Sequence, residues 1–344
     1  MPDSPLPDAE RGVQPLLRKT TLLQVLILAA AIPLFHYWAI RLPDREEVGA
    51  RTSKIVYTPV SLAPEGFAPL RLVGAWKMAS EDPRWGGISA LAVDGAELLT
   101  ITDSGVLARF PKPPTARATA RIRELPGGPG DPRFKRNRDA EALLRNPAGR
   151  GWWVAFENRN ELWLYDDRFS RPLSRIAFGR ERWPLNKGIE ALAQAGTEIL
   201  AFPEQGRTAV RFRGSSAQSV PIDFPRGRIS DAAQLPDGRL WVVHRNLTPV
   251  GFRNSLAELE PAANGYRIGE VMPLGVSPLD NVEAVTAERL PDGSTRLWLM
   301  TDDNLQRPMR TLLLALDVPP KRPRSPRGRV GRTAPGSPIP RPSS

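Results

Sequence analysis

Five copies of a two-part signature between residues 88 and 302 limit the folds open to this chain. The first part is a short apolar stretch with a polar second residue, and the second part is an apolar stretch that ends in a charged residue 14 to 19 positions later. The polar residues lie 40 to 53 positions apart. They are Ser89, Glu141, Glu190, Ser230 and Glu283, and the second parts end at Asp103, Glu157, Glu204, Arg245 and Asp302. This period is typical of β-propeller blades.

Each copy has the composition of β-strands. The apolar stretches are rich in Val, Ile, Leu, Trp and Thr, and turn dipeptides such as Asp237-Gly238 separate them. Two further strand-like stretches, residues 70–74 and 311–316, begin and end the region, and their pairing would close the ring without an open edge. We therefore predict an all-β propeller over residues 70–317, with six blades, and keep five or seven as alternatives.

The N-terminal part predicts a membrane segment. Residues 21–40 carry no formal charge and are long enough to span a hydrocarbon core of about 30 Å. We predict a short tail at 1–20, a signal-anchor at 21–40 and a linker at 41–69, and a cleaved signal peptide is the alternative for the apolar segment. We expect a protein of the bacterial inner membrane whose main domain faces the periplasm, or an exported protein if the segment is cleaved.

The charge distribution argues against a nucleic-acid partner. The net charge is +11, but residues 318–344 hold seven basic residues and no acid, and we predict a disordered Pro/Arg-rich tail there. The rest of the chain has neither an RNA-binding sheet motif nor a recognition-helix pattern. Contact of the tail with anionic lipid or nucleic acid is the lesser alternative, and we expect a monomer.

The absence of cysteine excludes disulfides, thiolate metal sites and cysteine catalysis. Of the two histidines, His36 falls in the apolar N-terminal segment, so a zinc site or a Ser-His-Asp triad would depend on His244 alone. Both are disfavoured.

The repeat predicts an acidic channel mouth. The innermost strand of each propeller blade lines the channel, so a polar residue that recurs at one place in that strand points toward the axis. The acids that end the second part, with Asp303, would join this ring. Such acids need positive charge nearby, because like charges repel and raise one another's pKa. The candidates are Lys187, Arg138, Arg245 and Arg159, or a hard divalent cation bound by carboxylate and amide oxygens.

The predicted metal ligands are Glu141, Glu190, Glu283, Asp302, Asp303, Asp103 and Glu157. Nearby residues that add oxygen donors are Asp139, Asn186, Asp280, Asn281 and Asn304. The alternative is structural: repeated acids of this kind also bind the backbone of the next blade and hold the ring together. The tryptophans of the strands, such as Trp241 and Trp298, are expected in the core between blades.

These motifs resemble the phytase-like family described as having esterase-like activity of phytase. The resemblance rests on residues 86–91, 139–143, 186–192, 228–231 and 280–285 leading to 301–304, within residues 70–317. It departs from the family where Ala142, Ala191 and Ala284 replace the usual glycine, and where His244 stands in place of an acid before Arg245.

The resemblance implies an exported propeller that hydrolyses phosphoesters or related esters. We expect Ca²⁺ held by the acids, a small phosphorylated or ester substrate, and catalytic roles for Glu141, Glu190, Glu283, Lys187 and Arg245. A non-catalytic binding or scaffold module of the envelope is the alternative, and a lactonase-like or carboxylester hydrolase at the same site is a further one.

Overall fold

A computed structural model describes residues 49–114, 117–178, 188–205, 207–214, 216–223 and 227–319 of the chain. These residues form twenty-one strands and three short 3₁₀ helices, η1 (Pro64–Phe67), η2 (Lys135–Asn137) and η3 (Glu157–Arg159). None of the helices in the described ranges is long and apolar enough to cross a membrane. The predicted signal-anchor at 21–40 and nearly all of the predicted C-terminal tail lie outside these ranges.

The strands form five antiparallel groups of four. The first group has β3 (Ile88–Asp94), β4 (Glu97–Thr102), β5 (Val106–Pro111) and β6 (Arg117–Glu124). The second has β7 (Ala140–Arg145), β8 (Trp152–Phe156), β9 (Glu161–Tyr165) and β10 (Pro172–Ala177). The third has β11 (Ile189–Ala195), β12 (Glu198–Pro203), β13 (Thr208–Arg213) and β14 (Ser216–Asp223).

The fourth group has β15 (Arg228–Gln234), β16 (Leu240–Thr248), β17 (Gly251–Ala262) and β18 (Gly265–Pro273). The fifth has β19 (Asn281–Arg289), β20 (Thr295–Asp302), β21 (Leu312–Val318) and, as its outer strand, β2 (Arg71–Ser80) from the start of the domain. One further strand, β1 (Arg51–Pro59), pairs with both β2 and β6 and so joins the fifth group to the first.

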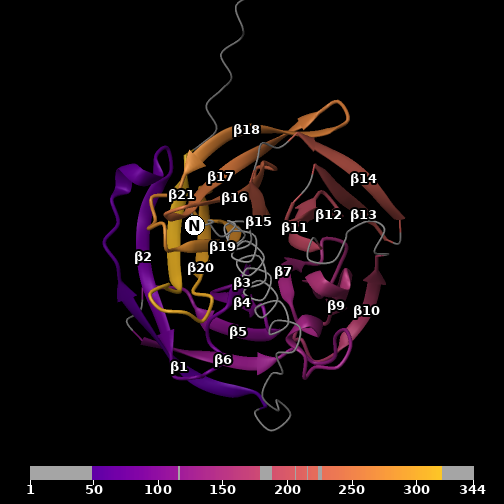
Figure 1. The fold of residues 1–344 in the computed structure, drawn as a ribbon, viewed down its shortest axis with the longest axis horizontal. Helices are drawn as coiled ribbons and strands as arrows, with labels where there is room; N and C mark the ends of the chain where they lie inside the picture. Colours follow the sequence, from indigo (N-terminus) through magenta and orange to yellow (C-terminus); the bar gives the residue numbers. More distant parts are fainter. Residues whose placement is uncertain are drawn as a thin grey trace, which may run out of the picture.

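These groups are the blades of a propeller-like ring. The first strands of the five groups contact one another in a closed cycle, β3 to β7 to β11 to β15 to β19 and back to β3. In Figure 1 these strands lie toward the middle, while β1, β2, β10, β14 and β18 lie on the periphery. The all-β prediction is confirmed.

The predicted number of six blades is wrong, because the described residues form five. The two terminal strands do pair as expected, with Leu72 opposite Leu316. They do not form a blade of their own, because β21 also pairs with β20 and supplies the third strand of the fifth blade. The predicted linker is also too long, since residues 51–59 form β1.

The hydrophobic core is divided into five clusters, one between each pair of neighbouring blades. Trp241 lies between the fourth and fifth blades and Trp298 between the fifth and first. Trp152 lies between the first and second blades, Trp153 between the second and third, and Phe202 between the third and fourth. Burial of these side chains, each worth about 2–3 kcal/mol, stabilises the ring by packing blade against blade. The predicted core role of Trp241 and Trp298 is confirmed.

Every inner strand carries a β-bulge at its second or third residue. The pairing register shifts between Ile88 and Ala90, Ala140 and Ala142, Ile189 and Ala191, Ile229 and Asp231, and Val282 and Ala284. The residues left without a partner are the polar residues of the repeat: Ser89, Glu141, Glu190, Ser230 and Glu283. A bulge re-aims the side chain of its extra residue, so the same local distortion positions five polar side chains in one way.

Candidate functional site

The acids of the repeat converge at one end of the channel. Glu141 interacts electrostatically with Asp103, Asp139, Glu157 and Glu190. Glu190 interacts in the same way with Glu204 and Glu283. Asp302 interacts with Glu283 on one side and with Asp103 on the other. These electrostatic interactions link acids of neighbouring blades around the channel.

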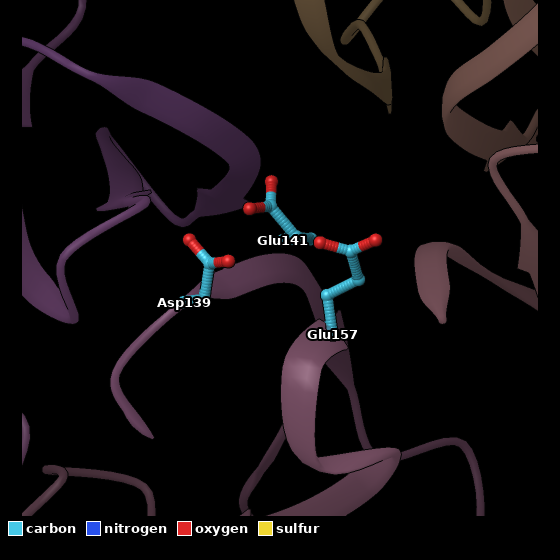
Figure 2. A group of neighbouring side chains, drawn as sticks. All are labelled: Asp139, Glu141 and Glu157. Atoms are coloured by element: carbon cyan, nitrogen blue, oxygen red, sulfur yellow. The ribbon is translucent and has the colours of Figure 1, made fainter. Parts of the chain in front are cut away.

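The densest part of this circle lies on the second blade. Asp139 comes just before β7, Glu141 is the bulge residue of β7, and Glu157 follows β8. Each offers a carboxylate oxygen, and the three oxygens lie within 4.8 Å of one another. Figure 2 shows the three carboxyl groups turned toward a common space. Asn158 donates a hydrogen bond to Asp139 Oδ2 and orients that carboxylate.

Burial and mutual repulsion raise the pKa values of these acids. Burial is the largest cause for Glu141, and the charges of Asp139, Glu190 and Glu157 add to it. The pKa of Glu157 rises to about 7, mainly because of burial, although a backbone hydrogen bond from Gly188 works against the rise. The pKa of Glu190 also lies well above its usual range, for the same reasons. In the absence of a cation, these groups retain protons at a pH where exposed carboxylates have none.

Asp302 has a similar environment on the fifth blade. It ends β20 and is buried, and burial, with the charges of Glu283 and Asp103, raises its pKa to about 8. Its Oδ1 accepts a hydrogen bond from the backbone N–H of Asn304 at 2.7 Å. The carboxyl is therefore held in one orientation while it retains a proton at neutral pH.

Two basic side chains lie among the acids. Lys135 Nζ is 2.7 Å from Asp103 Oδ2 and 3.3 Å from Asp139 Oδ1. Arg245 forms an ion pair with Glu283 and lies 3.6 Å from a Glu204 oxygen. Both cations gain from these carboxylates, which raise the pKa of each against the opposing effect of burial.

The mouth has more carboxyl groups than basic side chains. Its described carboxylates are Asp103, Asp139, Glu141, Glu157, Glu190, Glu204, Glu283 and Asp302, and the cations paired with them are Lys135, Arg228 and Arg245. Arg228 and Arg245 lie on the fourth-blade side of the mouth, where both form ion pairs with Glu204. On the second blade, Lys135 lies 3.3 Å from Asp139. Carboxylate oxygens of Asp139, Glu141 and Glu157 lie within 4.8 Å of one another, so a cation bound among them would be stabilised by all three.

Some acids near the mouth have structural roles instead. Asp303, predicted as a metal ligand, accepts hydrogen bonds from the backbone of Gly87 and Leu305 and from the Thr311 hydroxyl. It thus ties the fifth blade to the first. Asp280, predicted as an oxygen donor, is fully buried and pairs with Arg310. Both carboxylates are used to hold loops.

Asp231 fastens neighbouring inner strands. Its Oδ2 accepts a hydrogen bond from Val285 N–H of β19 at 2.8 Å, and its Oδ1 accepts one from Ala232 N–H at 2.8 Å. This is the blade-to-blade role that the sequence left open for the repeated acids, and it falls to the residue next to the bulge.

Four other predicted residues have different outcomes: Lys187, Asn186, Arg159 and His244. Lys187 and Asn186 lie outside the described residues. Arg159 donates to Asn137 Oδ1, so it supports a loop. His244 is buried beside Ser255, and its Nε2 lies where a side chain on Gly227 would be, so it is a packed residue.

The sequence reasoning missed Lys135 and Asn158. Both lie in short 3₁₀ helices, η2 before β7 and η3 after β8, and neither belongs to the repeated signature. The run of basic residues at 133–138, just ahead of the channel glutamate, is the one signal that pointed to a cation there.

Comparison with solved structures finds low overall similarity. The chain has 14% identity and a TM-score of 0.37 to hydrazine synthase of Kuenenia stuttgartiensis, with 65% of this chain and 58% of that chain covered. It has 11% identity and a TM-score of 0.46 to glutaminyl cyclase of Myxococcus xanthus, covering 73% and 97%. For a candidate 6-phosphogluconolactonase of Bacteroides uniformis, the values are 12%, 0.39, 73% and 91%. This chain therefore spans less than two thirds of the hydrazine synthase chain.

No curated protein matches this sequence. A family model does, and it covers residues 83–305, which contain all five bulged inner strands and the whole acidic mouth. The match extends over well more than half of the 344 residues. The chain belongs to the phytase-like family, described as having esterase-like activity of phytase.

Proposed function

We propose that the acidic mouth binds a divalent cation, Ca²⁺ by preference, and hydrolyses a phosphoester or a related ester. The observation that carries the proposal is the cluster of Asp139, Glu141 and Glu157, whose carboxylate oxygens lie within 4.8 Å of one another. The family description supports an ester substrate.

The donor set fits a hard cation. Ca²⁺ takes six to eight oxygen ligands from carboxylates, amides, carbonyls and water. Glu141 and Glu157 are half-buried, while the buried Asp139 is oriented by Asn158. The Glu190 carboxyl hydrogen-bonds Glu157 and lies beside the same space. When bound there, a divalent cation would polarise an oxygen of the scissile group.

The basic side chains suit an anionic substrate. Arg245 extends into the mouth and is held by Asn281 Oδ1 at 2.8 Å and by Glu283. A fixed guanidinium can donate two parallel hydrogen bonds to a phosphoryl group. Lys135, on the other side of the mouth, supplies a second positive charge. In our proposal these two residues orient the phosphoryl group and stabilise the negative charge that develops on it.

Asp302 is our candidate for the general acid. Its pKa of about 8 leaves it protonated at neutral pH, and its Oδ1 is occupied by the Asn304 N–H. The proton is therefore available from Oδ2. In the proposed step a water oxygen bonds to the phosphorus (or acyl carbon) and releases its proton to solvent, the bond to the leaving oxygen breaks, and Asp302 Oδ2 protonates that oxygen.

The test is hydrolysis by the full chain, purified in a neutral detergent, of phosphomonoester, phosphodiester and carboxylester substrates with Ca²⁺ or with EDTA. The disabled variant is Glu141→Gln/Glu283→Gln, and the matched control is Glu270→Gln, at an exposed position on β18. We expect Ca²⁺-dependent turnover in the wild type and the control only. If the wild type is no faster than the disabled variant on any substrate, the hydrolase proposal fails. Thermal stabilisation by Ca²⁺ without turnover would instead favour a binding module.

We also propose that the domain acts outside the cytoplasm, held by residues 21–40, as the apolar composition of that segment suggests. Protease treatment of intact spheroplasts tests this. Digestion of the propeller domain is expected, and its full protection would contradict the proposed location.

A further inference from the structure

A second charged site lies outside the channel mouth and shares none of its acids. A pocket of about 510 Å³ opens between the outer strands of the first blade and the β9–β10 turn of the second. Arg109 on β5 and Arg121 and Arg123 on β6 form one wall, Arg51 at the start of β1 borders it, and Arg168 faces them from the turn. The acids in the lining are Asp94 and Asp167.

The lining acids are already neutralised. Asp94 pairs with Arg109, and Asp167 pairs with Arg145 and Arg150, which stand outside the lining. Glu97, also outside it, pairs with Arg121 at 2.7 Å. Arg123 and Arg168 form no ion pair within the described part of the chain, and Arg123 has only a long hydrogen bond of 3.4 Å to the Glu124 carbonyl. The pocket therefore has a net positive charge, opposite in sign to the channel mouth.

Strand geometry explains how the arginines gather. Arg121 and Arg123 are two residues apart on β6, so their side chains leave the same face of the sheet. Arg109 pairs directly with Arg121 across β5 and β6, which adds a third guanidinium to that face. Like charges directly opposite each other destabilise a sheet, and the ion pairs of Arg109 with Asp94 and of Arg121 with Glu97 offset that cost here. Arg123, on the same face, is left to bind an anion.

We propose that this pocket binds a multiply charged phosphate-bearing anion. Arginine recognises phosphate through paired N–H donors, and a set of arginines approaching from two blades can contact more than one phosphate group. The volume is within the usual range for ligand pockets, about 300–1,000 Å³, and exceeds what one phosphate needs. An oligophosphate chain or the phosphorylated headgroup of a lipid has the required charge and size.

The two sources share this chemistry, and the place of the pocket makes both relevant. Ala50, which lines the pocket, lies ten positions after Ile40, the last residue of the predicted signal-anchor. Ten residues can span at most about 35 Å, so a lipid headgroup would be within reach if that segment is in a membrane.

The experiment is calorimetric titration of the full chain in neutral detergent with sodium tripolyphosphate, in EDTA so that no divalent cation is chelated. The test variant is Arg123→Gln/Arg168→Gln, chosen because these two side chains have no ion pair to lose among the residues that the structure describes. The matched control, Arg239→Gln/Arg267→Gln, removes the same charge from the fourth blade. We expect saturable binding by the wild type and the control, and a Kd weaker by about tenfold or more in the test variant. Equal binding by the test variant and the wild type, or no saturable binding at all, would overturn the proposal.

Two further arms separate the ligand source and the channel. Flotation with phosphatidylglycerol vesicles, against phosphatidylcholine vesicles, uses the same three proteins. Loss of phosphatidylglycerol binding in the test variant alone would assign a lipid headgroup, and tripolyphosphate binding without such a loss would assign a soluble anion. Glu141→Gln/Glu190→Gln is expected to bind tripolyphosphate as the wild type does. If the channel variant loses this binding while Arg123→Gln/Arg168→Gln keeps it, the anion binds at the mouth and the inter-blade assignment is wrong.

Discussion

Replacing Arg245 with methionine would test the electrostatics of the mouth. The guanidinium forms an ion pair with Glu283, and both side chains are largely buried, with 13% and 14% exposed. It is also 3.6 Å from a Glu204 oxygen and is stabilised by the negative charge of Glu190. Methionine keeps the length and apolar stem of the side chain but removes the only cation within 4 Å of Glu283 in the described ranges.

The expected cost follows from the uncompensated charge. Removing one partner of a buried ion pair typically destabilises a protein by about 3–5 kcal/mol. Glu283 can escape part of this cost by taking up a proton, because burial already raises its pKa. We therefore expect a loss of about 3 kcal/mol in unfolding free energy at pH 8, which corresponds to about 6–12 °C in Tm for a domain of this size.

The cost should depend on pH with a definite sign. Without Arg245 the native state binds an extra proton, so the penalty is smaller at low pH, where that proton is readily available. One protonating group changes the unfolding free energy by up to about 1.4 kcal/mol per pH unit. We expect the penalty at pH 5 to be smaller by about 2 kcal/mol than that at pH 8.

Urea unfolding of the full chain in EDTA, followed by tryptophan fluorescence at both pH values, measures this difference. Arg267→Met is the control, because the Arg267 side chain is 58% exposed and pairs with Glu260 at the surface, where an ion pair contributes about 0–1 kcal/mol. In Arg245→Met/Glu283→Gln we expect much of the lost stability to return. The reasoning is refuted if Arg245→Met costs the same at both pH values, or no more than the control.

Three other predictions follow from the same site. In EDTA the wild type should be less stable at pH 8 than at pH 5. The reason is that Glu157 and Asp302 have raised pKa values, so the native state binds more protons than the unfolded state up to about pH 7 to 8. A Tm that stays constant or rises between pH 5 and pH 8 would contradict this. Glu157→Gln should raise the unfolding free energy at pH 8 in EDTA by about 1 kcal/mol and remove the thermal stabilisation by Ca²⁺, and a variant that Ca²⁺ still stabilises as it does the wild type would count against the assignment. Asp231→Ala should lower the unfolding free energy, measured in urea, by about 2–3 kcal/mol because it leaves two buried N–H groups without an acceptor. The control Asp292→Ala, in an exposed turn, should lower it by less than about 1 kcal/mol. Equal losses in the two variants would contradict the strand-fastening role of Asp231.

The repeat predicted the ring and its acids because each copy encodes the same local distortion. An apolar stretch with a polar second residue becomes an inner strand with a bulge, as at Glu141 and Glu190. The sequence therefore gives the direction of these side chains as well as their spacing. The number of blades is not encoded in this way. It depends on which strands β2 and β21 pair with, and β21 pairs with both β2 and β20.

Neighbouring acids show where sequence reasoning stops. Asp302 and Asp303 are adjacent residues of the same type, so the repeat does not distinguish them. Successive residues at a strand end, however, point in opposite directions. Asp302 therefore faces the mouth acids, while Asp303 binds the loops at Gly87 and Thr311. Lys135 could not be assigned to the mouth from the repeat, because it lies outside the repeated signature. Its side chain reaches Asp103 and Asp139 because the segment before β7 folds back toward them.

The most direct test of the cation site is a calcium titration of the full chain by calorimetry at pH 7.5, beside Glu141→Gln/Glu157→Gln and the exposed control Glu270→Gln. We expect saturable binding by the wild type and the control, and its loss in the double variant. Unchanged binding in the double variant, or none in the wild type, would contradict this expectation.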